Sequence, residues 1–152
     1  MGNMQGAYKP FCQDTFDTYD KLCRLRVSDY FEELISSKGW QLKDSDDPYA
    51  PDLCVVSQDN VEFYFEVEQK NNWGKGNFPF PTLQIPERKR KFAELPAIFC
   101  VLNKYHTRMA TVKASKVISS PVVEVSNRYV KSGELFFQVP VCDVKFYQMR
   151  AE

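Results

Sequence analysis

Two carboxylates and a lysine in the first half of the chain have the residue types and the spacing of a metal-binding hydrolytic site. Asp52 opens one predicted strand, while Glu68 and Lys70 lie at the end of the next one. Glu68 and Lys70 are separated by one residue, so on a strand both side chains project from the same face. Asp52 enters from the neighbouring strand at the same end of the hairpin. We therefore expect the three side chains to converge on one point.

Two carboxylates suit Mg²⁺, a hard cation that prefers oxygen ligands and usually retains several waters. The backbone carbonyl of Gln69 would complete the protein's share of the ligands, and Mn²⁺ would substitute for Mg²⁺. A metal held here would polarise a phosphoryl oxygen, help to generate hydroxide and stabilise the charge of an in-line displacement. The ammonium of Lys70 would offset the carboxylate charge and contact the phosphate.

The hairpin that must position these residues has strands at 53–57 and 61–69, joined by a short polar connection. In the second strand, alternation places Phe63, Phe65 and Val67 on one face and Tyr64, Glu66, Glu68 and Lys70 on the other. Glu66 is either an additional ligand or a residue that meets solvent. The alternative interpretation of the whole motif is a solvated charged face on which Lys70 pairs with a glutamate.

Hydrophobic periodicity and turn residues predict the remaining elements. These are helices at 15–38 and 83–95 and strands at 40–42, 97–102, 108–112, 122–125, 135–139 and 144–147. Ser28 or Asp29 could cap a second helix within the first helical segment, and Gly39 stops its last turn. Pro86 suits the first turn of the second helix, and the apolar run at 97–102 suits a strand buried on both faces.

The order helix, three strands, helix, strand, with Pro51-Asp52 and Glu68-Gln69-Lys70 on consecutive strands, resembles the PD-(D/E)xK nuclease superfamily. The match covers roughly Asp29 to Leu102. The resemblance implies an α/β restriction-endonuclease-like fold, a mixed central sheet flanked by helices, with an extra β-rich C-terminal segment. It also implies that Asp52 and Glu68 bind the metal and that Lys70 orients or helps to deprotonate the attacking water.

Within that superfamily the chain is locally similar to phage endonuclease I and other Holliday-junction resolvases. The similarity lies in Lys38-Gly39-Trp40, Tyr49-Ala50-Pro51-Asp52 and Val67-Glu68-Gln69-Lys70 followed by Trp73. The hairpin is longer than in the phage enzyme, and Ser28 stands about where the family has a helical glutamate. Asp29, which we favour, or Glu32 or Glu33 could supply that carboxylate. The similarity implies a DNA endonuclease, a possible homodimer and a phage or viral origin.

The densest basic cluster of the chain lies in the second predicted helix, at 88–91. On a helix Arg88 and Lys91 share a face, which could contact the phosphate backbone or simply face solvent. The preceding loop carries Lys75, a further candidate for contact with nucleic acid. It also carries Trp73, which could stack on a base or cover the core.

The chain has 152 residues, with 20 Lys plus Arg against 20 Asp plus Glu. This balance argues against a surface coated in positive charge for tight non-specific binding to nucleic acid. Acids nevertheless gather at 44–52 and 62–68 and bases at 88–91, which predicts an acidic pocket beside a basic rim. A non-catalytic nucleic-acid-binding or assembly module on the same fold is the alternative function.

Length and composition predict one globular domain at 14–152 after a flexible arm at 1–13. No run is apolar enough to span a membrane, and no signal-peptide pattern is present, so we expect an intracellular, cytoplasmic protein. Five widely spaced cysteines favour free thiols over a disulfide framework. The one histidine, His106, is expected to be a surface residue rather than a general base.

Overall fold

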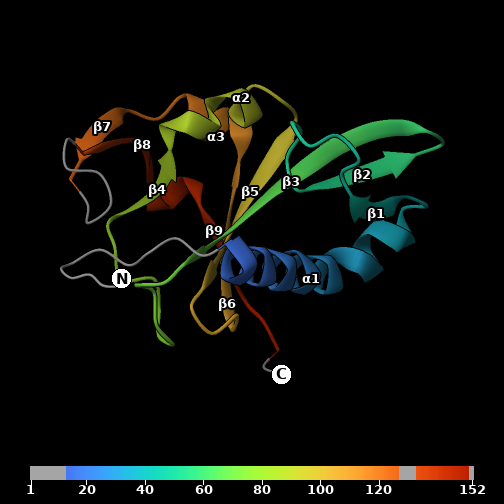
Figure 1. The fold of residues 1–152 in the computed structure, drawn as a ribbon, viewed down its shortest axis with the longest axis horizontal. Coiled ribbons are helices and arrows are strands. Elements are labelled where there is room, and N and C mark those ends of the chain that lie inside the picture. The colour runs from blue at the N-terminus through green and yellow to red at the C-terminus, as the bar shows by residue number, and fades with distance from the viewer. Residues whose placement is uncertain (1–12, 127–132, 151–152) are drawn as a thin grey trace.

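One long helix, α1 (Gln13–Ser37), begins the described part of the chain, which comprises residues 13–126 and 133–150 of a computed structural model (Figure 1). The predicted arm therefore lies outside the described residues, except for Gln13. The helix continues through 28 and 29 without the predicted second cap, because Val27 and Ile35 belong to one buried stripe that spans this point. It ends as predicted at Gly39, whose φ of +77° closes the last turn.

A six-stranded main sheet carries the central part of the chain, in the order β1-β2-β3-β5-β6-β9. Its strands are β1 (Gln41–Asp44), β2 (Leu53–Ser57), β3 (Asn60–Lys70), β5 (Ala97–Asn103), β6 (Arg108–Lys113) and β9 (Lys145–Gln148). β3 and β5 are parallel, and every other neighbouring pair is antiparallel. The predicted β2–β3 hairpin is confirmed. Its turn places Gln58 and Asp59 at positive φ, the conformation of the tightest hairpin connections.

A second sheet of three strands has the order β4-β8-β7, with β4 (Thr82–Pro86), β8 (Glu134–Pro140) and β7 (Val122–Val125). The predicted helix at 83–95 is therefore wrong in its first part. Leu83 and Ile85 are buried two residues apart, which is the period of a strand, and β4 pairs with β8 about fifty residues later. Within 83–95, the helical residues are those of η1 (Glu87–Lys89) and α2 (Arg90–Ala93).

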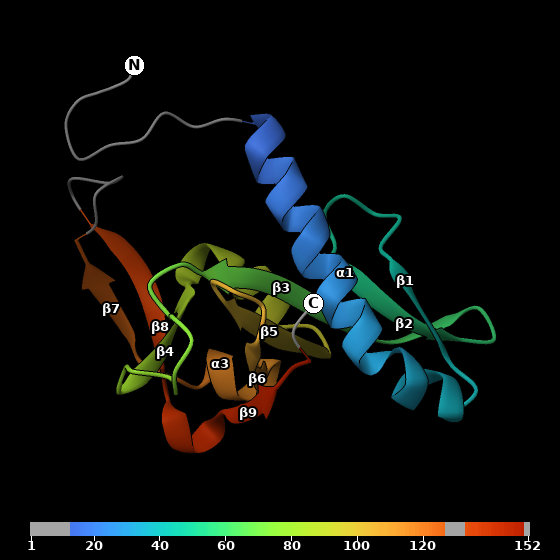
Figure 2. The same ribbon diagram turned by 90° about the horizontal axis from the view of Figure 1, so that it is seen from below.

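The main sheet has different neighbours on its two faces (Figures 1 and 2). α1 packs on one face through a cluster that includes Val27, Phe65 and Leu102. The second sheet and the short helix α3 (Ala114–Ile118) pack on the other face, in a cluster that includes Phe99 and Phe137. The domain is thus a mixed α/β structure with a mostly antiparallel sheet, and no described helix is long and apolar enough to cross a membrane.

The C-terminal segment contributes to both sheets. β7 and β8 complete the second sheet around β4, and β9 adds the last strand of the main sheet beside β6. A one-turn 3₁₀ segment, η2 (Val141–Asp143), connects β8 to β9. The predicted strands of this region are confirmed to within one or two residues at each end.

Phe65 stacks on Phe31 of α1 and meets Phe63 of its own strand edge-on, and it is 1% exposed. We expect Phe65→Ala to lower the free energy of unfolding by about 3 to 5 kcal/mol, through lost apolar burial and the cavity that remains. Val61→Ala on the same strand, where the side chain is 46% exposed, should change it by less than about 0.5 kcal/mol. Urea unfolding of both variants measures the difference, and similar losses would contradict this packing.

Candidate active site

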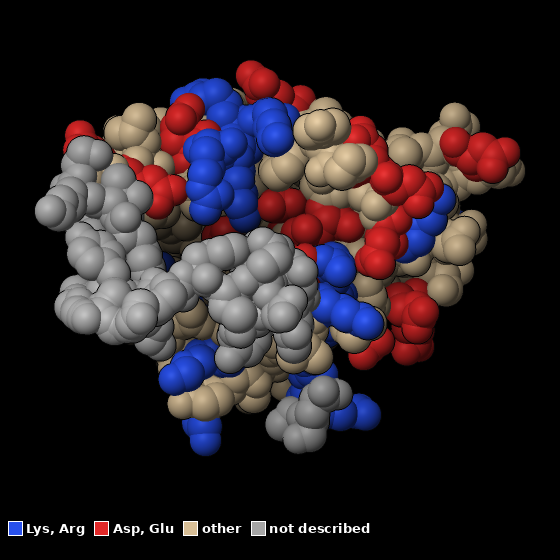
Figure 3. Space-filling view, in the orientation of Figure 1, with Lys and Arg blue, Asp and Glu red and all other residues tan. Residues whose placement is uncertain are grey.

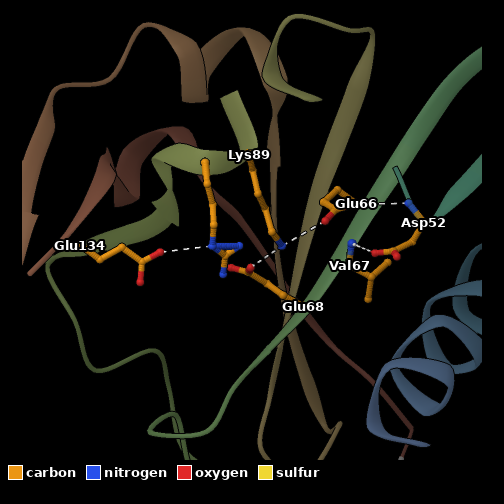
Figure 4. Close-up of polar contacts among 7 residues, drawn as sticks. Asp52, Glu66, Val67, Glu68, Lys89 and Glu134 are labelled. Carbon is orange, nitrogen blue, oxygen red and sulfur yellow. Dashed lines mark hydrogen bonds and ion pairs between the residues drawn. The ribbon is translucent and has the colours of Figure 1, made fainter. Parts of the chain in front are cut away.

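Asp52 is fixed at the edge of β3 where β2 has not yet begun to pair. The first pair of the two strands is Leu53 with Phe65, so beyond this point no strand of the described chain pairs with β3 on that edge. The backbone amide of Val67 donates to Oδ2 of Asp52 at 2.9 Å, and the amide of Asp52 donates to Oε1 of Glu66 at 3.2 Å (Figure 4). These two bonds hold the Asp52 carboxylate against the strand that carries the other acids.

Glu66 and Glu68 project from one face of β3, as alternation predicts, and both contact a lysine from η1. Nζ of Lys89 lies 3.0 Å from Oε2 of Glu66 and 2.8 Å from Oε2 of Glu68 (Figure 4). The side chains are 13% exposed for Lys89, 9% for Glu66 and 24% for Glu68. We call these three residues the Lys89 triad. They form a largely desolvated ion cluster in which a single ammonium bridges two carboxylates.

The environment shifts the pKa of two triad members upward. Burial raises the pKa of Glu66 to about 7, an effect that the nearby Lys89 ammonium opposes and the Asp52 carboxylate reinforces. Burial alone would lower the pKa of Lys89, but the charges of Glu68 and Glu66 outweigh burial and raise it. Lys89 therefore stays charged in the folded protein, whereas Glu66 titrates near neutral pH.

These groups line a pocket of about 430 Å³. α1 contributes Asp20 and Cys23, β3 contributes residues 66–69, and η1 contributes Arg88 and Lys89, with Asp52 between them. Figure 3 shows acidic side chains in the middle of this face with basic side chains on either side of them. The expectation of an acidic pocket beside a basic rim agrees with this arrangement.

Two residues of the pocket lining, Cys23 and Gln69, form a hydrogen-bonded group with His106. Sγ of Cys23 donates to Oε1 of Gln69 at 3.6 Å, and Nε2 of His106 lies 2.6 Å from the same oxygen. Burial, and after it the charges of Asp52 and Glu68, raise the pKa of Cys23 to about 11, so its thiol is not a nucleophile near neutral pH. His106 is partly exposed and takes part in these contacts.

The oxygens in the pocket suit a divalent cation. Asp52 and Glu68 use only Oδ2 and Oε2 in their contacts, which leaves Oδ1 and Oε1 without partners among the described residues. Alternate residues of a strand direct their backbone groups to the same edge, so the Gln69 carbonyl points to the edge that the Val67 amide faces. No group of three or more His, Cys, Asp or Glu side chains in the described chain is arranged to hold a metal. Two carboxylates with waters nevertheless meet the requirements of Mg²⁺.

Lys70 lies next to this pocket rather than in its lining. Its Nζ sits over the ring of Phe80 at 4.8 Å from the ring centre. Burial lowers the pKa of Lys70, while the charge of Glu68 acts in the opposite direction. The structure thus brings Asp52, Glu68 and Gln69 together in one pocket and leaves Lys70 one strand position beyond Gln69.

Asp29 is placed elsewhere, which corrects the expectation that it supplies a third carboxylate. The residues of α1 that line the pocket are Asp20 and Cys23, whereas Asp29 lines a separate cavity near Arg26 and Arg150. The reason is helical geometry, because Asp29 follows Cys23 by about 9 Å along the helix axis and points to another side. The carboxylate of α1 nearest to the predicted role is Asp20, which forms an ion pair with Arg24.

Arg88 and Lys91 do not share a regular helical face, because η1 and α2 together form only two short turns. Arg88 lines the pocket and pairs with Glu134 at 3.3 Å. Lys91 is exposed, with Nζ 5.0 Å from the ring centre of Phe92. Lys89, which the sequence places between them on the same basic run, is the residue that reaches the carboxylates.

Trp73 is 1% exposed and its Nε1 donates to the Gly76 carbonyl at 3.0 Å. Its burial confirms the alternative that it covers the core, while its contact with nucleic acid stays a prediction. Lys75 is exposed, with Nζ 5.2 Å from the ring centre of Tyr105, and it does not line the pocket of the Lys89 triad.

No protein-family model matches the sequence, and a search of curated proteins finds no match. The function of the chain has to be inferred from the pocket itself. Three residues that line the pocket were not predicted as site residues from the sequence: Lys89, Asp20 and Cys23. Only Lys89 gave a local signal, because it belongs to the basic run that was expected to lie beside the acids.

Lys89→Met should lower the free energy of unfolding by about 3 kcal/mol, since it leaves two partly buried carboxylates without their cation. Adding Glu66→Gln in the same chain should recover part of the loss. Lys91→Met is the matched control, because Lys91 is exposed, and it should cost less than about 0.5 kcal/mol. Urea unfolding in EDTA measures all three, and equal effects of the two lysine substitutions would contradict the bridging role of Lys89.

Glu66 should make the metal-free protein less stable as pH rises. Its pKa of about 7 lies above the ordinary value of 4.5, so between these values the folded state holds a proton that the unfolded state has lost. Stability from this group is complete below about pH 4.5 and is lost as pH rises toward 7, by at most about 3 kcal/mol.

Glu66→Gln cannot ionise, so the decline in stability over this pH range should become smaller in that variant. Glu94→Gln, at an exposed position, should keep the full decline. The measurement is urea unfolding in EDTA at several pH values. An unchanged pH dependence in Glu66→Gln would show that Glu66 is already ionised in the folded state.

Proposed function

We propose that the chain is a Mg²⁺-dependent nuclease of the PD-(D/E)xK type, which hydrolyses phosphodiester bonds in nucleic acid, with DNA as the favoured substrate. The observation that carries this proposal is the meeting of Asp52 and Glu68 in one pocket. The two acids come from neighbouring strands, each has a carboxylate oxygen free of described partners, and the Gln69 carbonyl faces the same edge.

The arrangement of the elements supports the proposal. α1 precedes the three antiparallel strands β1, β2 and β3, and η1 and α2 precede β5, which runs parallel to β3. This order agrees with the helix, three strands, helix, strand pattern expected of a restriction-endonuclease-like fold. The second helix of that pattern is shortened here to a single turn, because the residues before it form β4.

Asp52, Glu68 and the Gln69 carbonyl would hold the metal. When bound, Mg²⁺ would supply Lewis-acid polarisation of a phosphate and a lowered pKa for bound water. Lys70 would face the reacting phosphate from beside Glu68, and its lowered pKa makes it easier for this amine to exchange a proton with water. Arg88 at the rim is placed to contact a neighbouring phosphate, a contact that would compete with Glu134.

Lys89 has two effects on such a site. Its ammonium neutralises part of the carboxylate charge, which reduces repulsion of a phosphate backbone. It also fixes Glu68 through Oε2, so that the other oxygen of this carboxylate has one orientation. Lys89 is therefore a positioning residue for Glu68 in the proposed reaction.

The same triad is the observation in favour of a second function, a non-catalytic nucleic-acid-binding or assembly module. Because Lys89 forms ion pairs with both Glu66 and Glu68, it offsets part of their charge without any metal. Such a module would bind nucleic acid in EDTA as well as in Mg²⁺, would show no heat of Mn²⁺ binding, and would leave the substrate intact.

Asp52→Asn tests the choice between the two functions. We expect the native protein to cut DNA in Mg²⁺ or Mn²⁺, and Asp52→Asn to lose at least about a hundredfold in rate, because one metal ligand becomes neutral. Supercoiled, linear, single-stranded and four-way-junction DNA, together with RNA, are the substrates. Titration calorimetry with Mn²⁺ gives a second readout that does not need turnover, and Asp52→Asn should abolish its heat.

Asp29→Asn is the matched control, because the structure places this exposed carboxylate outside the pocket. It should retain native cleavage and native Mn²⁺ binding. Lys70→Ala should lower cleavage while leaving Mn²⁺ binding in place. A folded native protein that binds no Mn²⁺ and cuts none of these substrates would overturn the nuclease proposal and favour the binding module.

A further inference from the structure

A second cavity, of about 440 Å³, lies where the loop after β3 packs against β6 and β9. Its walls are aromatic, from Trp73, Phe78 and Phe80 of the loop and Phe146 and Tyr147 of β9. This volume is within the range of small-molecule binding sites, and we call the feature the aromatic cavity. Figures 1 and 2 show the loop that follows β3 leaving the sheet at the end of that strand.

The aromatic cavity is held open by contacts in the fold. Trp73 lines the cavity and packs edge-on against Phe78, with ring centres 5.1 Å apart. Phe78 lies between Phe80 and Phe146, at 5.3 and 5.4 Å. The fully buried Asn103 donates to the Gly74 carbonyl and so fastens the loop to the end of β5. The rings are thus fixed before any ligand arrives, which reduces the entropy cost of binding.

Two basic residues lie at the aromatic cavity, and Arg108 is the one charged residue in its described lining. Arg108 lines it, with Nε donating to the Lys75 carbonyl and a terminal nitrogen donating to Oδ1 of Asn77, both at 3.0 Å. Lys70 lies over the ring of Phe80. An aromatic interior with a basic rim suits a flat ring system that is attached to an anion.

Lys70 connects this cavity with the acidic pocket. Glu68 and Lys70 leave β3 on the same face about 7 Å apart along the strand. Glu68 lines the acidic pocket, while the ammonium of Lys70 sits on a ring of the aromatic cavity. A strand of nucleic acid whose phosphate occupied the acidic pocket would therefore bring an adjoining nucleotide to the aromatic cavity.

We propose that the aromatic cavity binds an unpaired nucleobase of the strand whose backbone crosses the acidic pocket. This inference rests on the proposed nuclease function and deepens it, because it assigns single-stranded or locally unpaired nucleic acid as the substrate class. A base within an intact duplex is stacked on both faces and cannot enter such a cavity without first being extruded. Arg108 and Asn77 provide polar groups at the rim for the edge of the base or its phosphate.

Binding of oligo-dT in EDTA tests the cavity without any cleavage. The chain contains two tryptophans, so a Trp40→Phe background leaves Trp73 as the sole tryptophan reporter in the cavity lining. We expect single-stranded oligo-dT to change the fluorescence of Trp73. The same oligo-dT annealed to oligo-dA should bind more weakly and leave the fluorescence unchanged.

Phe146→Ala should weaken binding of single-stranded oligo-dT about tenfold, by removing one stacking face. Phe146→Leu keeps apolar volume but removes the π-face, so it should also weaken binding. It replaces the alanine variant in the test if that variant is unstable. Phe146 is 44% exposed, which favours retention of the fold. Tyr49→Ala is the matched control, since Tyr49 is an aromatic residue that is 78% exposed and does not line the cavity, and it should bind normally.

Native affinity in both Phe146 variants, or an unchanged Trp73 signal with bound single strand, would overturn the aromatic cavity as a base site. The nuclease proposal would survive that result if native protein still cuts DNA and Asp52→Asn does not. Equal binding of single strand and duplex would also overturn the assigned substrate class. Failure of the native protein to bind or cut any nucleic acid would overturn both proposals together.

Discussion

The bridge from Lys89 to Glu66 and Glu68 is the interaction on which the arrangement of this site depends. It joins β3 of the main sheet to η1, the segment that follows β4. Both sides of this contact are charged and poorly solvated. Two acids on one face of an interior strand would be costly without this cation. η1 carries Lys89 to β3, and η1 and α2 are the two short helical turns between β4 and β5.

The hairpin and its acids could be predicted because their signals are local. Alternating apolar residues define β3, a polar turn defines its pairing with β2, and these two facts already place Asp52 near Glu68. β4 could not be predicted in this way, since its partner β8 lies about fifty residues later and Leu83 to Leu95 also permits a helix. A single helix at 83–95 would place Arg88 and Lys91 on one face. The prediction of that helix, in place of β4, therefore favoured these two residues over Lys89.

Other site residues depend on packing that sequence patterns do not reveal. Asp20, Cys23 and Asp29 all lie on one helix, and the rotation of α1 against the sheet decides which of them meets the pocket. Trp73 is a similar case, because a loop tryptophan is as suitable for stacking on a base as for closing a core. Its burial follows from Phe78 and Phe146, and the second of these comes from the last strand of the sheet.

The chain has equal numbers of acidic and basic residues, and acids and bases also lie close together in the site. Asp52, Glu66 and Glu68 supply three acids, and Lys89, Arg88 and Lys70 lie around them as three bases. The fourth acid of the lining, Asp20, pairs with Arg24. A phosphate approaching such a cluster meets no strong net repulsion, yet it also gains little long-range attraction. Affinity must then come from short-range contacts, and the aromatic rings beyond Lys70 provide apolar surface for them. On the proposed function, selection of unpaired bases would follow from this distribution of charged and aromatic residues.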